Sequence, residues 1–422
     1  MAGKLFLALV ALLCVVSPTL SQTQSDDVVR ITTNLVQVDV VVTKKGKPVK
    51  DLKAEDFEIF EDGKPQTITS FVFVSTLSNN TGTSATAATS AKDPNAPSDP
   101  SLPPFMPSEV VGRKIVFVVD DYGLSSTSIA SIRRQLRKFI DEQMKPNDLI
   151  AIVRTSHARR EKPQLTSDKS RINQAWEQLK WNPCSRVGVK PMARVGDETP
   201  VGCGMAVGSF DESISSIRAI VNALGHVPGR KSMIIFSNDT PLRDEEKLAY
   251  GSSSVITAGP GDSTKDDSRN YNARLNRLSE MAIRSSVVVY GIDAAGLQTT
   301  HMTAADATLN PRVSGSEGNR SFTKQLGDRS KQIQSRREGA DELAKATGGF
   351  LVKDQNDFQF EKILEDQSSY YVIGYRPSTE TFNKQFHKIR ARVKLSGFEV
   401  RTRSGFFGMS EEDARRLKET NK

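Results

Sequence analysis

The chain has 422 residues, 37% of them hydrophobic, with 58 Lys and Arg against 50 Asp and Glu and a formal net charge of +8. This length suggests two or three domains, and so mild a charge suits a globular protein better than a nucleic-acid binder with one concentrated basic stripe. The 4 His and 3 Cys lie far from one another, which excludes zinc ribbons, HExxH proteases and disulfide-dense scaffolds.

Residues 1–21 have the pattern of a secretory signal peptide. Lys4 supplies a positive start, and an apolar run follows from Leu5 to Val16. That run is shorter than the roughly 20 residues that span a bilayer. The less favoured alternative to a signal peptide is a buried core helix. We therefore expect an exported protein, secreted or in the periplasm or cell envelope, with no transmembrane segment after cleavage.

Export changes the expected state of the cysteines. Cys184 and Cys203 are left once the signal peptide, with Cys14, is removed. An oxidising compartment favours a disulfide between them, worth about 3 kcal/mol, over two free thiols.

Residues 26–74 are predicted to form β-strands. Apolar side chains alternate with more polar ones from Val36 to Val42, and Asp62-Gly63 is a hairpin signal. Residues 75–108 are rich in Ser, Thr, Ala, Asn and Pro, which is typical of a linker.

Residues 109–367 alternate between predicted strands and helices. The strands are expected at 115–119, 149–153, 232–236, 287–292 and 350–352, and the helices at 125–144, 214–224, 275–283 and just before Gly348. Repeated units of this kind predict an α/β fold with a doubly wound, mostly parallel sheet. Two Gly/Ser/Asp/Arg-rich stretches, 250–272 and 294–337, are expected to be surface insertions.

Residues 368–408 return to a β pattern, and 409–422 form a charged tail. Each β-rich end offers only two or three strands, too few for independent stability. We therefore expect 26–74 and 368–408 to form one smaller β-sandwich-like region. The strand at 388–395 carries basic residues on one face, which indicates either a solvated face or, less favoured, a site for an anionic polymer.

Polar residues follow several predicted strands of the parallel sheet, where doubly wound folds bind ligands. They are Asp120, Asp121 and Ser125 after the first strand, Ser237, Asn238 and Asp239 after 232–236, and Asp293 after 287–292. Such oxygen ligands suit Mg²⁺. The favoured alternative is that Asp120 and Asp121 cap the following helix and hydrogen-bond to neighbouring loops.

Separated motifs in a fixed order resemble the von Willebrand factor type A (vWA) domain and, more closely, the exported vWA-related proteins abundant in Acidobacteria. The motifs are Val38–Val42, Leu52–Gly63, Pro228-Gly229-Arg230-Lys231-Ser232, Leu343-Ala344 with Thr347–Gly349, Tyr370–Tyr375 and Arg401–Phe407. The resemblance implies a Rossmann-like vWA sheet and a metal-ion-dependent adhesion site.

The usual first motif of that adhesion site is Asp-x-Ser-x-Ser, and this chain departs from it. Counting from Asp120, the two serine positions hold Tyr122 and Leu124, while a register from Asp121 recovers only Ser125. The usual Thr has loose counterparts in Ser209 and Ser213, and the later Asp falls on Asn238, next to Asp239. The resemblance thus implies a degenerate site, with Asp120, Asp121 and Ser125 as its candidate metal ligands.

No nucleophile elbow, phosphate loop or dinucleotide fingerprint occurs where a strand meets a helix, and no aromatic platform accompanies the basic residues. We therefore predict a non-enzymatic, adhesion-type protein that binds a protein or cell-envelope ligand and no nucleic acid, with Mg²⁺ as its one candidate cofactor. The alternatives are a metal-independent structural or assembly module of the envelope and, less favoured, a hydrolase.

Overall fold

The computed structural model describes residues 35–75, 112–158, 162–182, 210–238, 263–295, 334, 337–353, 358–377 and 383–408. All of them belong to one compact unit, Leu35–Lys422. The predicted signal peptide, the Cys184–Cys203 pair, the predicted linker beyond Ser75 and the tail at 409–422 lie outside the described residues. Over the ranges described, no helix combines the length and apolarity needed to cross a bilayer.

The strands are β1 (Val36–Lys44), β2 (Lys47–Pro48), β3 (Phe57–Glu61), β4 (Lys64–Gln66), β5 (Ile68–Ser75), β6 (Lys114–Val119), β7 (Leu149–Arg154), β8 (Lys231–Ser237), β9 (Val287–Asp293), β10 (Leu351–Val352), β11 (Ser369–Tyr375), β12 (Phe386–Val393), β13 (Glu399–Thr402) and β14 (Gly405–Phe407). The helices are the 3₁₀-helix η1 (Ala54–Asp56), α2 (Ser126–Lys138), the π-helix η2 (Phe139–Gln143), α3 (Lys169–Glu177), α4 (Phe210–Leu224), α6 (Ser263–Arg284) and α8 (Phe360–Ser368). Residues 337–347 are also helical.

A five-stranded parallel sheet has the order β10-β9-β8-β6-β7. The chain runs from β6 to β7 on one side and then crosses back to β8 on the other side of β6. The connections therefore reverse direction between β6 and β8, which is the switch point where ligands bind in doubly wound sheets. The predicted α/β fold with a parallel sheet is confirmed at this level.

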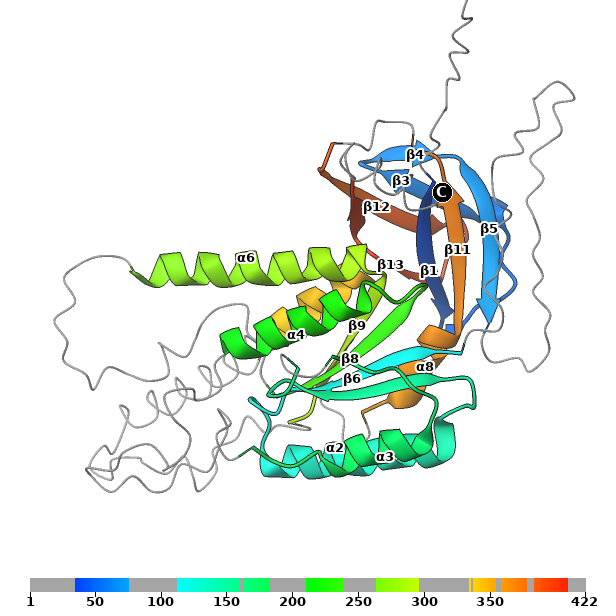
Figure 1. The fold of residues 1–422 in the computed structure, drawn as a ribbon. Coiled ribbons are helices and arrows are strands. Elements are labelled where there is room, and N and C mark those ends of the chain that lie inside the picture. The colour runs from blue at the N-terminus through cyan, green and yellow to red at the C-terminus, as the bar shows by residue number, and fades with distance from the viewer. Residues whose placement is uncertain are drawn as a thin grey trace, which may run out of the picture. The chain divides into compact units, whose positions relative to one another are not determined.

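Helices cover both faces of the parallel sheet (Figure 1). Apolar residues of α2, α3 and α8 pack on one face, and those of α4 and α6 on the other. In β6, Phe117 belongs to the first core, and its neighbours Val116 and Val118 belong to the second. Both faces are buried, which explains the unbroken apolar runs of these strands.

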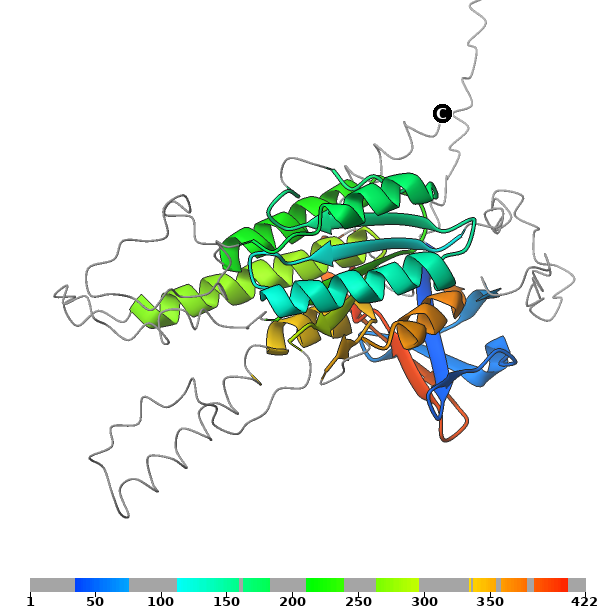
Figure 2. The ribbon, with the colours of Figure 1, turned by 90° about the horizontal axis from the view of Figure 1, so that it is seen from below.

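The remaining strands form two antiparallel sheets built from both ends of the described chain. One has the order β13-β1-β11-β5 with β2 beside β1, and the other has the order β14-β12-β3-β4. Figures 1 and 2 show the blue and the orange-red strands side by side. The sheets share an apolar core in which the rings of Phe57 and Tyr371 lie 5.1 Å apart. The expectation that the two β-rich ends pack together is confirmed.

Three helices differ from the sequence prediction. α3 was not expected, and only Ile172 of its residues is buried, so its apolar stripe is weak. α6 begins at Ser263 rather than near 275, inside the predicted insertion 250–272, because its first half is polar and gives no apolar period. Residues 358–364 are expected from the sequence to complete the series of strands and helices, and the structure shows the helix Phe360–Ser368 there.

The basic residues of β12 alternate with inward apolar ones, as expected. Lys388, Arg390 and Arg392 are exposed, whereas Ile389 is buried. Arg392 forms an ion pair with Glu58 of the neighbouring strand β3. This arrangement fits the solvated-face interpretation.

Candidate functional site

Asp120 and Asp121 lie directly after β6, at the carboxyl end of the parallel sheet. Their exposed fractions are 2% and 1%. The Asp120 amide donates a hydrogen bond to the carbonyl of Phe236 in β8 at 3.0 Å, which holds the pair at the β6/β8 switch point. Two acidic side chains are thus buried where this class of sheet binds ligands.

The Asp120 carboxylate accepts hydrogen bonds from hydroxyl groups of three separate elements. Ser213 of α4 donates to Oδ1 at 2.6 Å, and Ser237 at the end of β8 donates to Oδ2 at 2.9 Å. The hydroxyl of Thr155, just after β7, lies 3.1 Å from Oδ1. One carboxylate therefore collects oxygen-bearing side chains that are far apart in the sequence.

Asp121 is held by the segment that follows β7. It accepts from the Ser156 amide at 2.9 Å and from the Ser156 hydroxyl at 2.5 Å. Its Oδ1 also lies 3.0 Å from the Thr155 hydroxyl, which is the same hydroxyl that faces Asp120. A hydroxyl group has one proton and can donate it to one acceptor at a time, so Asp120 and Asp121 share the Thr155 hydroxyl as a donor. A bound cation would reduce the repulsion between these two buried carboxylates.

The oxygen atoms of Asp120 and of the hydroxyl groups around it are of the kind that a hard divalent cation binds. Carboxylate and hydroxyl oxygens are ligands that Mg²⁺ accepts, and soft sulfur ligands are absent among the described residues here. The residues that would hold the ion are Asp120, Thr155, Ser213 and Ser237. Bound there, it would supply a positive charge for an acidic ligand group.

Ser125 has a different role from the predicted one. Its hydroxyl accepts from the Ser128 amide at 3.1 Å and forms the N-cap of α2. This finding corrects the interpretation of Asp120 and Asp121 as the caps, because the turn that begins at Asp121 ends before Ser125, the residue that caps the helix. Their predicted hydrogen bonding to a neighbouring loop is confirmed by the contacts of Asp120 with Thr155 and of Asp121 with Ser156.

The remaining predicted residues are only partly brought together. Asn238 accepts from the Ser128 hydroxyl at 3.2 Å, beside the site. Asp293 forms an ion pair with Arg337 at 2.6 Å, so an arginine already balances its charge. Ser209 and Asp239 lie outside the described residues.

Thr155 and Ser156 were not predicted from the sequence. They directly follow the apolar strand β7, just as Asp120 and Asp121 follow β6. This shared position after a buried strand is the signal that could have revealed them.

The motif Gly229-Arg230-Lys231 lies at the opposite end of the parallel sheet, where β8 begins. Gly229 has a φ of +75°, which favours glycine, and Arg230 forms an ion pair with Asp39 of β1 at 3.2 Å. The Arg230 guanidinium also lies 4.5 Å from the ring centre of Tyr370 in β11. The motif therefore joins the parallel sheet to the antiparallel sheet rather than forming part of the site at Asp120.

Comparison with known proteins adds little to this description. No family model matches the chain, and no curated protein matches it. Among solved structures, it is similar to the three N-terminal domains of the type V pili tip protein Mfa5 from Porphyromonas gingivalis. The match has 12% sequence identity and a TM-score of 0.28, and it covers 89% of this chain and 67% of that chain. A likeness at this TM-score supports no inference about fold or function.

Proposed function

We propose that this chain is an exported, non-enzymatic binding protein that uses the carboxyl edge of its parallel sheet, in a vWA-like domain, to hold Mg²⁺ and through it an acidic group of a protein or envelope ligand. The observation that carries the proposal is the convergence of Thr155, Ser213 and Ser237 on the carboxylate of Asp120. These side chains come from three elements and meet at the switch point of the sheet.

The departure from Asp-x-Ser-x-Ser is compatible with this function. The two serine positions after Asp120 hold Tyr122 and Leu124, neither of which offers a suitable oxygen. Hydroxyls from other elements lie at the same carboxylate, so the oxygen donors of an adhesion site are available without the local motif.

The second candidate is a metal-independent structural or assembly module of the cell envelope. It is favoured by the near-complete burial of Asp120, Asp121 and Thr155 and by the hydroxyl donors that already surround both carboxylates. In that case the cluster stabilises the loops at this edge by hydrogen bonding alone.

Calorimetric titration with Mg²⁺ separates the two candidates. We expect the mature chain, freed of metal by a chelator, to bind Mg²⁺ and Asp120→Asn to bind it at least tenfold more weakly, because the substitution removes the ligand charge. Asp141→Asn is the matched control, since Asp141 lies on η2, is exposed and forms an ion pair with Arg137 of α2.

Equal Mg²⁺ affinity in wild type and a folded Asp120→Asn variant, or no binding by wild type, would overturn the cation site and support the metal-independent module. Turnover by the wild type on a panel of esters, phosphate esters and peptides would overturn the non-enzymatic assignment.

A further inference from the structure

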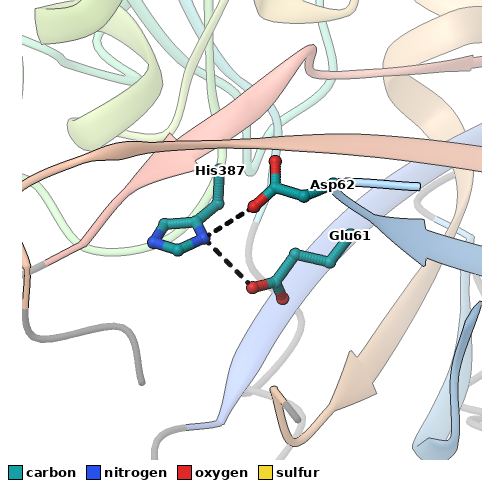
Figure 3. A group of neighbouring side chains, drawn as sticks. All are labelled: Glu61, Asp62 and His387. Carbon is teal, nitrogen blue, oxygen red and sulfur yellow. Dashed lines mark hydrogen bonds and ion pairs between the residues drawn. The ribbon is translucent and has the colours of Figure 1, made fainter. Parts of the chain in front are cut away.

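A second cluster of ligand-type side chains lies in the antiparallel sheets: Glu61, Asp62 and His387 (Figure 3). Glu61 ends β3, Asp62 lies in the turn before β4, and His387 lies in β12, which pairs with β3. The Nδ1 atom of His387 is 3.0 Å from an oxygen of Asp62 and 3.2 Å from one of Glu61. Glu61 and His387 are 1% and 5% exposed, whereas Asp62 reaches solvent.

The hydrogen bonds of Asn383 determine which ring nitrogen of His387 carries a proton. The Asn383 side-chain oxygen accepts from the Gln385 amide at 2.9 Å and lies 3.1 Å from Nε2 of His387. That oxygen can only accept, so Nε2 must donate. In the neutral ring, the lone pair then lies on Nδ1 and points toward the two carboxylates.

Three electron-rich atoms therefore lie close together: Nδ1 of His387 and one carboxylate oxygen each of Asp62 and Glu61. A lone pair next to two carboxylate oxygens is repulsive unless a proton or a metal cation lies between them. In metal sites, the second ring nitrogen of a metal-binding histidine usually donates a hydrogen bond to an acceptor that is not itself a ligand. The side-chain oxygen of Asn383 is such an acceptor here.

Two of the three side chains, Asp62 and His387, are held in place by their neighbours. Asp62 accepts from the Lys388 amide at 2.8 Å through Oδ1, which directs Oδ2 toward His387. The ring of His387 stacks on Phe406, with centroids 5.0 Å apart and an interplanar angle of 16°. Such preorganisation lowers the cost of ordering the ligands when an ion binds.

The separations of His387 Nδ1 from the two carboxylate oxygens are compatible with a tetrahedral ion as well as with hydrogen bonds. With bonds of about 2.0–2.1 Å to nitrogen and oxygen, two ligands of a tetrahedral zinc ion are about 3.3 Å apart. The observed separations of 3.0 and 3.2 Å are close to this value. An imidazole with two carboxylates is a ligand set for Zn²⁺ and related first-row ions rather than for Mg²⁺.

We propose that Glu61, Asp62 and His387 bind one Zn²⁺ ion, with water as the fourth ligand on the solvent side of Asp62. Binding releases no proton when the ring is neutral and one proton when Nδ1 is protonated. Since Asp62 and His387 are 325 residues apart in the chain, the ion would link the two ends of the chain that build the antiparallel sheets.

Zinc titration of four proteins tests the site: wild type, Asp62→Asn, His387→Gln and the control His226→Gln, whose histidine is exposed in the turn after α4. Asp62 has a φ of +49°, a conformation that asparagine also tolerates, and the Asn side-chain oxygen keeps the bond from the Lys388 amide. Asp62→Asn is therefore expected to fold even if His387→Gln does not.

We expect the chelator-treated wild type and His226→Gln to bind Zn²⁺ and to unfold at a higher temperature when it is present. Asp62→Asn and His387→Gln should lose at least tenfold in zinc affinity together with that thermal shift. No zinc binding by wild type, or equal affinity in wild type and a folded Asp62→Asn, would overturn the proposal. In a fifth titration, Asp120→Asn should bind Zn²⁺ like wild type, which keeps this outcome separate from that of the Mg²⁺ site.

Discussion

Lys231 shows how a single side chain can oppose the stability of the fold that contains it. It lies at the amino end of β8, is 3% exposed, and donates to the carbonyl of Val227 at 2.6 Å. Burial, with a smaller contribution from the nearby charge of Lys114, lowers the pKa of Lys231 to about 8. Keeping a proton on this buried amine therefore costs free energy at neutral pH.

The free energy of unfolding should rise as pH increases from about 8 toward 10. In the unfolded chain Lys231 keeps its proton up to about pH 10.5, whereas the folded protein releases it near 8, so the unfolded state binds more protons over this range. Urea denaturation at about pH 7.5 and about pH 9.5 measures this slope. Lys231→Met should reduce the pH dependence of the free energy of unfolding, whereas the exposed-site variant Lys138→Met should leave it unchanged. An unchanged pH dependence in Lys231→Met would show that Lys231 is not its cause.

At the scale of elements, the start of α2 positions the carboxyl edge of the sheet. Ser125 caps the helix, and the buried residues Ile129, Ile132 and Leu136 recur at helical spacing against the sheet. The cap fixes where the helix begins, and Ser128 in its first turn contacts Asn238 at the end of β8. The helix start is therefore coupled to the candidate site without contributing a ligand to it.

Ser125→Ala should lower the free energy of unfolding by about 1 kcal/mol, because it removes the acceptor of the Ser128 amide. Urea denaturation compares it with Ser126→Ala, a substitution of the exposed residue that follows the cap, which should have little effect. An equal loss in the two variants would show that the cap hydrogen bond is not the cause.

At the scale of the whole molecule, charged, aromatic and backbone contacts join the parallel sheet and its helices to the antiparallel sheets. Arg230 reaches Asp39 and the ring of Tyr370, and the Ser404 amide donates to the carbonyl of Ala346 at 2.9 Å. These contacts lie within one compact unit. The sheets should therefore unfold together in a single transition.

A double-mutant cycle on Arg230→Met and Asp39→Asn should give a coupling energy of about 1–2 kcal/mol, because the guanidinium is largely buried where it meets the carboxylate. The exposed pair Arg137–Asp141 is the control and should couple by less than about 0.5 kcal/mol. Additive effects at Arg230 and Asp39 would show that this pair does not join the sheets.

The elements that could be predicted from the sequence are those with a local signal. The apolar run before Asp120 predicts a strand buried on both faces. The alternation in Val36–Val42 predicts a strand, since side chains repeat every two residues along it, but the single buried face that it predicts holds only up to Val40, after which residues 41–43 are all buried. Asp62-Gly63 predicts the hairpin turn between β3 and β4 for the same local reason. The polar first half of α6 carries no such period, so its start was misplaced.

The two candidate sites depend on tertiary structure. Asp120 could be placed at a strand end, but Thr155, Ser213 and Ser237 reach it only because β7, α4 and β8 surround the end of β6. The small number of histidines excludes zinc ribbons, yet one histidine suffices for a mixed site once β12 pairs with β3. Periodicity acts over a few residues, whereas a binding site needs side chains from distant segments at one point, and only strand order and register bring them there.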